Sequence, residues 1–184
     1  MFLGYTIAFV LSCVLTLLLL IWAAPRRYQI KLTRTLTAPP ARVWAYLSEP
    51  DRYPRWFPYV ASCTLDGEPA QGVGQKRRIR LDRDGVLGER EDEVVTWEEN
   101  RRIDMLQRNE IMHGRPVGWR DARAEYRVEP SGDGTKITGV LWFFGRGLLG
   151  GVFSLLFFRK RHEKDLRLAL SHLEKRLREE TYPV

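Results

Sequence analysis

The residues best suited to chemistry are an arginine and a glutamate on neighbouring predicted strands. Alternation along a strand, counted from Ile79, turns Arg77 inward, and the same count from Val95 and Trp97 turns Glu93 inward. Buried charges must pair or meet a polar ligand group, because an isolated buried charge costs several kcal/mol. Glu93 is also the one candidate for a catalytic proton-transfer group. A β-bulge in 86–93 would instead turn Glu93 to solvent, and this alternative stays open.

Two amide side chains extend this polar set. Ile103 and Met105 are predicted to face inward, and the same alternation places Gln107 and Asn109 beside them. Amides of this kind orient the polar group of a bound molecule in an otherwise apolar site. We therefore expect a mainly apolar interior with a few polar groups.

Other chemical motifs are weaker. Gly145 to Gly150 has the formal G-x-G-x-x-G spacing of a dinucleotide loop. A dinucleotide site needs a further strand carrying the acid that binds the ribose, and the residues after this loop have a helical pattern. We interpret Gly145 to Gly151 as a hinge between a strand and the last helix, and we expect no cofactor.

Metal-binding and nucleophilic groups do not cluster in the sequence. His113, His162 and His172 lack metal-ligand spacing, Ser154 lacks the G-x-S-x-G setting, and Cys63 has no evident basic partner. We interpret all five as polar residues on the surface or at a helix flank. No metal is expected, and no catalytic constellation is visible.

These side chains need strands to position them. Alternating patterns and turn signals predict seven strands and two short helical segments, at 40–47 and 51–58. Leu166, Leu170, Leu173 and Leu177 have the spacing of a long amphipathic helix that covers one face of the sheet. The predicted strands are 28–37, 59–66, 75–82, 86–98, 101–112, 119–129 and 135–144.

The first 25 residues differ from the rest. No charged residue occurs from Phe2 to Ala24, and this length suffices for a hydrocarbon core that takes about 20 helical residues. A cleaved signal peptide is the competing interpretation, but a basic start is missing. We expect a transmembrane anchor at 1–25 and a soluble domain at 26–184. The residues expected at the membrane are Leu3, Leu11, Leu18, Trp22, Arg26 and Arg27.

Charge indicates orientation and partners. Basic residues follow the apolar segment closely, which favours a single-pass protein of the cell membrane whose domain faces the cytoplasm. The net charge of +7 suits a domain near anionic lipid headgroups. Nucleic acid is not expected as a partner, because acids interleave with the basic residues and no nucleic-acid motif occurs.

The order of the predicted elements, together with local motifs, resembles a known superfamily. The motifs are the segment Arg34 to Leu47, the segment Asp51 to Trp56, Gly72 to Gly74, Trp97-Glu98, Gly132 to Thr135 and Leu149 to Gly151. They are similar to the polyketide cyclase/dehydrase-like branch of the START-related (SRPBCC) superfamily. The resemblance covers about 28–178 and implies an α+β helix-grip fold, a curved antiparallel sheet around a long C-terminal helix.

The resemblance also implies a deep apolar cavity between sheet and helix that binds a lipid or another hydrophobic small molecule. This fold hosts carriers as well as enzymes. We therefore expect a membrane-anchored binding domain that carries or presents its ligand, with a polyketide cyclase/dehydratase-like enzyme or a non-catalytic membrane adaptor as alternatives. The expected ligand-binding residues are Arg77, Ile79, Glu93, Val95, Trp97, Met105, Gln107, Asn109, Tyr126, Leu141, Phe143, Val152 and Leu156.

The stretch from Trp142 to Phe158 has two interpretations. Its aromatic and aliphatic residues either pack within the domain or form an apolar patch that contacts the bilayer, with Arg159 to Arg161 meeting lipid phosphates. A second membrane span at 140–158 is disfavoured by four glycines and by Arg146 near its centre.

Overall fold

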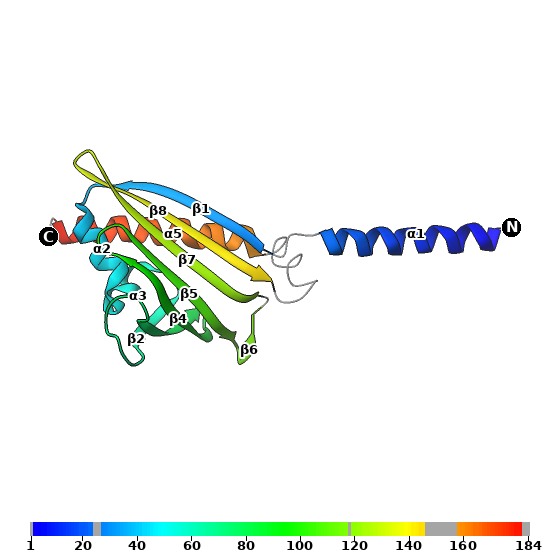
Figure 1. The fold of residues 1–184 in the computed structure, drawn as a ribbon, viewed down its shortest axis with the longest axis horizontal. Coiled ribbons are helices and arrows are strands. Elements are labelled where there is room, and N and C mark those ends of the chain that lie inside the picture. Colours follow the sequence, from blue (N-terminus) through cyan, green and yellow to red (C-terminus); the bar gives the residue numbers. More distant parts are fainter. Residues whose placement is uncertain (1, 24–26, 118, 146–157, 182–184) are drawn as a thin grey trace.

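The computed structural model describes residues 2–23, 27–117, 119–145 and 158–181. An N-terminal helix projects from a domain in which a curved sheet surrounds a long C-terminal helix (Figure 1). The helices are α1 (Phe2–Ala23), α2 (Pro40–Ser48), the 3-10 turn η1 (Pro50–Arg52), α3 (Tyr53–Trp56) and α5 (Arg159–Thr181). The strands are β1 (Arg27–Leu36), β2 (Val60–Leu65), β3 (Lys76–Arg83), β4 (Val86–Glu98), β5 (Arg102–Met112), β6 (Arg115–Pro116), β7 (Trp119–Ser131) and β8 (Gly134–Gly145).

The strands form one antiparallel sheet in the order β1-β8-β7-β5-β4-β3-β2, with β6 paired to β5. The seven predicted strands are confirmed, and the two-residue β6 is an addition. Consecutive strands pair through short turns, of which the β3–β4 turn holds Asp84 and Gly85 at positive φ (55° and 82°). β8 pairs with β7 on one side and with β1 on the other, so the first strand lies at one edge of the sheet.

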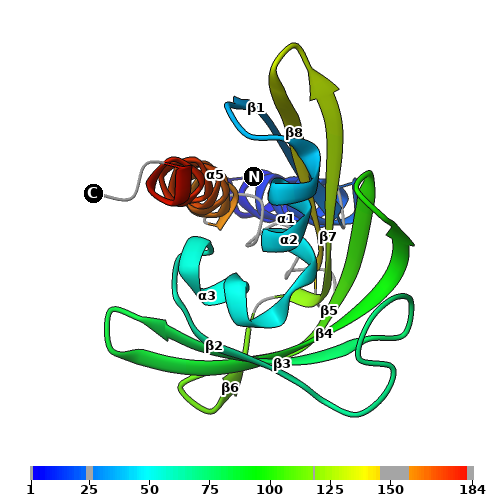
Figure 2. The same cartoon turned by 90° about the vertical axis from the view of Figure 1, so that its left-hand side faces the viewer.

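The long helix α5 lies on the concave side of the sheet (Figure 2). Its predicted apolar stripe is confirmed, because Leu166, Leu170, Leu173 and Leu177 are all buried. Each buried leucine contributes up to about 1.5–3 kcal/mol relative to an exposed one. The helix thereby supplies the covering layer that an antiparallel sheet with one apolar face requires.

The short helices close one end of the concave side. α2 starts at Pro40, where a missing N–H is tolerated, and it buries Val43, Trp44 and Leu47 as predicted. The Trp56 indole of α3 donates a hydrogen bond to the Tyr46 carbonyl over 2.9 Å. Because these helices fill that end, open space inside the domain remains near the start of α5.

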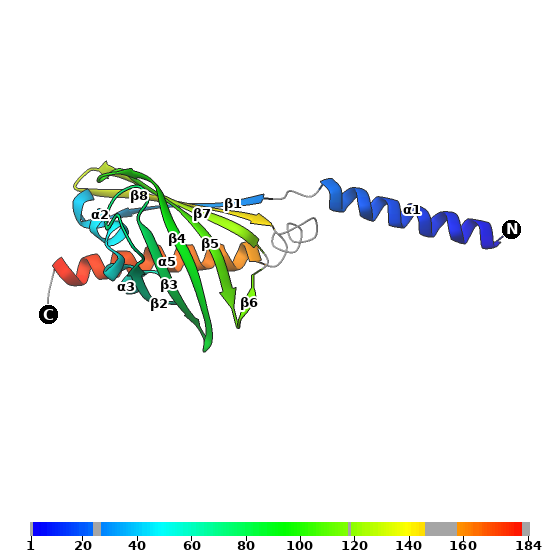
Figure 3. The same ribbon diagram turned by 60° about the horizontal axis from the view of Figure 1, so that its bottom comes forward.

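Helix α1 extends away from the domain in two views (Figures 1 and 3). It has 22 residues without a charge, and its predicted membrane residues Leu11, Leu18 and Trp22 are exposed, as is Arg27 at the start of β1. Among the residues that the structure describes, no helix combines the length and apolar character needed to cross a membrane. The predicted transmembrane helix is therefore not supported.

Several predictions fall on positions outside the described residues. These are the ligand-binding residues Val152 and Leu156, Arg26, the side chain of Leu3, and all of the glycine hinge beyond Gly145. The alternative of a second span at 140–158 begins within β8, where residues 140–145 are paired in the sheet. These six residues are thus part of the folded domain.

Candidate functional site

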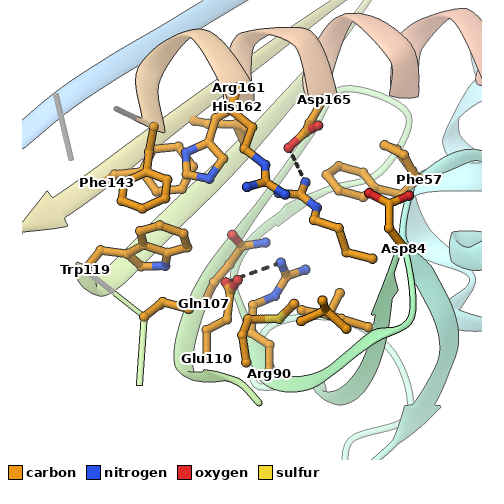
Figure 4. Close-up of a pocket in the computed structure, with 18 residues that line it drawn as sticks. Phe57, Asp84, Arg90, Gln107, Glu110, Trp119, Phe143, Arg161, His162 and Asp165 are labelled. Carbon is orange, nitrogen blue, oxygen red and sulfur yellow. Dashed lines mark hydrogen bonds and ion pairs between the residues drawn. The ribbon is translucent and has the colours of Figure 1, made fainter. Parts of the chain in front are cut away.

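A cavity of about 430 Å³ lies between the sheet and the first turns of α5 (Figure 4). Its apolar wall consists of aromatic and aliphatic side chains from the sheet, from Phe57 and Pro58 after α3, from Val117 and from Phe158. Its polar groups are Arg83, Asp84, Arg90, Gln107, Glu110, Arg161, His162 and Asp165. This size and this mixture are typical of small-molecule sites, which are about 300–1,000 Å³ and mainly apolar.

One wall is an aromatic cluster around a buried histidine. The His162 ring stacks on Phe143 with ring centroids 4.2 Å apart, and the Trp119 ring meets it edge-on at 4.8 Å. A 2.8 Å hydrogen bond joins His162 Nδ1 to the Tyr28 hydroxyl, which connects α5 to β1. Burial, together with nearby arginines, lowers the pKa of His162 to about 3, so the imidazole is neutral.

The floor of the cavity is a charged cluster on β4 and β5. Arg90 Nε donates to Asp92 Oδ1 over 2.7 Å, and its Nη2 lies 3.2 Å from Asp92 Oδ2 and 3.3 Å from the Tyr53 hydroxyl. Arg90 Nη1 is 3.8 Å from Glu110 Oε2. Both Arg90 and Asp92 are buried, so each depends on the other for compensation of its charge.

Glu110 is the acid of this cluster that faces the open space. Its carboxylate and the Gln107 amide point toward the middle of the cavity in Figure 4. Burial raises the pKa of Glu110 and Asp92 adds to this, while Arg90 and a hydrogen bond with Trp119 act in the opposite direction. Glu110 can therefore form hydrogen bonds to a molecule in the cavity. Its ion-pair partner Arg90 lies 3.8 Å away and is already paired with Asp92.

An ion pair crosses the cavity between the sheet and the helix. Arg83 on β3 donates to Asp165 on α5, and the Arg83 guanidinium also lies 4.1 Å from the centre of the Tyr59 ring. Burial raises the pKa of Asp165 although Arg83 opposes this shift. Asp84 and Arg161 are exposed at the rim. The rim thus contains both signs of charge.

Three of the predicted ligand-binding residues line the cavity. They are Gln107, Leu141 and Phe143. Ile79, Met105 and Tyr126 point inward as predicted, but they are buried in the core. Their part in binding stays a prediction.

The predicted inward orientation of Glu93, Val95 and Asn109 is wrong. Glu93 is 3.2 Å from Arg108 on the outer face, Val95 is exposed, and Asn109 donates to Glu91 on the same outer face. Two irregularities explain this: the β4–β5 pairing shifts between Val94 and Thr96 and again between Glu89 and Glu91. Each extra residue reverses which side chains face inward beyond it. The alternative that a bulge in 86–93 turns Glu93 to solvent thus gives the correct orientation of Glu93. The irregularity that produces this orientation, however, lies between Val94 and Thr96.

Arg77 and Trp97 are turned inward but lie away from the cavity. Arg77 donates to Gln75 over 2.8 Å and to the Leu47 and Ser48 carbonyls at the end of α2 over 3.2 and 2.8 Å. Burial lowers its pKa. Trp97 packs edge-on against Trp44. The predicted Arg77–Glu93 pair is absent from the described contacts, because the two side chains lie on opposite faces of the sheet.

Sequence reasoning missed Arg90, Glu110, Trp119 and His162. His162 was interpreted as a surface or flank residue, but it lies four residues before Leu166 and thus on the buried stripe of α5. Cys63 is also buried, and burial raises the pKa of its thiol to about 12, whereas His113 and His172 are exposed. In the described ranges no group of three or more His, Cys, Asp or Glu residues could hold a metal ion.

Comparison with known proteins identifies the family. Residues 27–178 match the family described as polyketide cyclase/dehydrase and lipid transport. The chain belongs to this family. A protein of Mycobacterium tuberculosis described as uncharacterised is 30% identical over 150 residues, which is 80% of this chain and 83% of the relative. The polyketide cyclase/dehydrase and lipid transport family is part of the SRPBCC superfamily predicted from the sequence.

Solved structures share the helix-grip fold. The ginseng major latex-like protein 151 has a TM-score of 0.65 and 12% identity, and the match covers 83% of this chain and 98% of that one. The di-domain aromatase/cyclase BexL of the BE-7585A pathway has a TM-score of 0.66 and 18% identity, covering 86% of this chain and 52% of that one. These likenesses establish the α+β fold, a curved antiparallel sheet around a long C-terminal helix.

Proposed function

We propose that this chain binds a hydrophobic small molecule or a single lipid chain in the 430 Å³ cavity and carries or presents it at a membrane. The observation that carries the proposal is the cavity itself, an open space whose wall is aromatic and whose floor holds a few buried polar groups. Binding would rest on burial of apolar surface, at about 25 cal/mol per Å². The neutral His162 favours this, because it adds an aromatic face without a charge.

The test is native mass spectrometry of the full-length protein released from lipid nanodiscs. We expect a copurified or added hydrophobic molecule bound one to one. Leu141→Trp fills the cavity and should abolish binding, since Leu141 lines it. Leu65→Trp is the matched control, because Leu65 is exposed on β2 away from the cavity. Protein that stays unoccupied with every hydrophobic compound supplied, or equal binding by both variants, would contradict the proposal.

We further propose that α1 attaches the domain to the cell membrane, with the domain on the cytoplasmic side. The support is an uncharged helix with exposed apolar side chains, which water solvates poorly, followed by a domain of net charge +7. In Figure 1 the domain end nearest α1 also contains the first turns of α5, which line the cavity. Attachment through α1 would hold the cavity close to lipid.

Flotation of the full-length protein with vesicles containing anionic lipid tests this attachment. Leu11→Asp and Leu18→Asp together should move the protein to the unbound fraction, whereas Leu65→Asp on the domain surface should leave it on vesicles. Wild-type protein that remains soluble and does not float with the vesicles would contradict the proposal. Protease protection of the two termini in sealed vesicles would reveal on which side the domain lies.

A cyclase- or dehydratase-like enzyme is the second candidate, and one observation favours it. Glu110 faces the cavity and burial raises its pKa, a direction that suits a carboxyl group taking part in proton transfer. Glu93, the candidate from the sequence, lies on the outer face. A linear poly-β-ketone thioester incubated with the protein should lose one water if the enzyme hypothesis holds, and Glu110→Gln should stop that loss. An unchanged mass with wild-type protein removes this candidate.

A further inference from the structure

Two arginines of the cavity, Arg90 and Arg83, are already paired with carboxylates. Arg90 is paired with Asp92 at 2.7 Å, and Arg83 is paired with Asp165. These two guanidinium groups therefore each have a carboxylate partner, whereas the third arginine of the lining, Arg161, is exposed at the rim. An anionic ligand placed beside Arg90 or Arg83 would have to displace one of these carboxylates, which would then be left buried without compensation.

Glu110 makes the interior still less suitable for an anion. Its carboxyl lies 3.8 Å from Arg90, whose charge Asp92 already neutralises at shorter distance. A carboxylate ligand near Glu110 would place two like charges in a poorly solvated space, whereas a hydroxyl group could donate a hydrogen bond to Glu110 and accept one from the Gln107 amide. The polar floor thus matches a donor that carries no charge.

The volume limits the apolar part of the ligand. At about 30 Å³ for a water-sized group, 430 Å³ accommodates about 14 such groups. This suffices for a fused ring system or a single medium-length chain, but not for a phospholipid with two acyl chains. The stacked rings of His162 and Phe143, with Trp119 edge-on, favour a flat molecule along that wall.

We infer that the cavity selects a neutral hydrophobic molecule with a hydroxyl group, which donates to Glu110, over the carboxylate of the same skeleton. This inference rests on the proposed binding function and specifies its ligand chemistry. Glu110 is the specificity-determining residue, because its carboxylate accepts a hydrogen bond from a hydroxyl group and repels the charge of a carboxylate.

Three matched probes test the inference: 2-naphthol, 2-naphthoate and naphthalene. Each is titrated calorimetrically at pH 7.5 into full-length protein in lipid nanodiscs, and heats with empty nanodiscs are subtracted. We expect naphthol to bind about tenfold more tightly than naphthoate and several-fold more tightly than naphthalene, as one hydrogen bond to a charged acceptor predicts. Naphthoate should gain affinity as the pH is lowered toward its own pKa.

Glu110→Gln should reduce the preference for naphthol over naphthoate to less than about threefold, because the amide can donate to the carboxylate. Glu93→Gln, the same substitution on the outer face, should leave the preference unchanged. A purely structural role of Glu110 would weaken all three probes equally. If Glu110→Gln does not fold, the probe ratios and the pH dependence of the wild-type protein still decide the matter.

The outcomes separate two failures. If no probe binds, the proposed ligand-binding function fails together with this inference. If naphthoate binds as tightly as naphthol, or if naphthalene does, the cavity binds hydrophobic molecules but the selection of a neutral hydroxyl is overturned. Tight naphthoate binding that depends on Arg161 would place the polar group at the rim instead and would also overturn it.

Discussion

The two faces of the sheet bury carboxylates in different ways. On the concave face, Arg90 and Asp92 are buried, and the partly exposed Glu110 faces an open cavity. On the convex face, Asp104 is fully buried, yet it is covered by Arg102 at 2.7 Å and by Arg123, whose side chains reach solvent. Other elements of the fold cover the concave cluster, whereas Asp104 on the convex face is covered only by the side chains of Arg102 and Arg123.

This difference shows that burial of a charged group does not by itself indicate a binding site. Hydrogen bonds from Arg102 and Arg123 lower the pKa of Asp104, as expected for a carboxylate with sufficient partners. Burial raises the pKa of Glu110, because its partners do not compensate for desolvation. The incompletely compensated group beside an open space is the one suited to bind a ligand.

Arg90→Met should give the largest effect of a single substitution. It leaves Asp92 buried without a counter-charge, and we expect a loss of about 3–5 kcal/mol in the free energy of unfolding, measured by urea denaturation. A loss below about 1 kcal/mol would mean that water reaches Asp92 and that the concave cluster is not enclosed.

Replacement of His162 should change the dependence of stability on pH. Folded His162 has a pKa near 3 and its ordinary value is 6.5, so between these values the unfolded chain binds more protons. Its contribution to stability is present above pH 6.5 and is lost as the pH falls, by up to about 1.4 kcal/mol per pH unit. The difference between wild type and His162→Phe, from denaturation at several pH values, should have this slope.

The raised pKa values of Glu110 and Asp165 act with the opposite sign, because they favour the folded state as the pH falls. They are common to both proteins and cancel in the difference. Parallel stability curves for wild type and His162→Phe would show that His162 has the same pKa in the folded and unfolded states and would contradict the lowered pKa.

Arg123→Met tests the convex cluster. Asp104 keeps two hydrogen bonds from Arg102, at 2.9 and 2.7 Å, so we expect a loss of about 1 kcal/mol or less by the same urea assay. A loss as large as that of Arg90→Met would remove the distinction between the two faces.

Glu93→Gln should have the smallest effect. Its partner Arg108 is half exposed, and exposed ion pairs contribute about 0–1 kcal/mol. We expect a change in unfolding free energy below about 0.5 kcal/mol and no change in probe binding. Altered probe binding in this variant would restore Glu93 as a candidate for the site.

Much of the fold could be predicted from the sequence. Alternating segments such as 119–129, with Ala122, Ala124 and Tyr126 buried, and turn signals such as Asp84-Gly85 are local, so they position strands to within a few residues. The stripe of leucines on α5 likewise predicts its buried face. These features depend on neighbours in sequence, and the structure confirms them.

The site could be predicted only in part, because it depends on bulges and on packing between distant segments. Asn109 adopts φ 53°, a conformation that asparagine tolerates, and this bulge turns Glu110 rather than Asn109 toward the cavity. The shift between Val94 and Thr96 brings Arg90 and Asp92 inward in place of Glu93. The charged run 89–93 has no apolar alternation that could have revealed this orientation.

The most direct test of the central claim, that a ligand occupies the cavity between sheet and α5, uses the three methionines of the chain. Met112 lines the cavity, whereas Met105 is buried beside Arg77 outside it. With methyl-¹³C methionine in the full-length protein, 2-naphthol should cause a saturable ring-current shift of the Met112 methyl signal and little change at Met105. A Met112 signal that does not move while naphthol binds would place the ligand elsewhere and contradict the account.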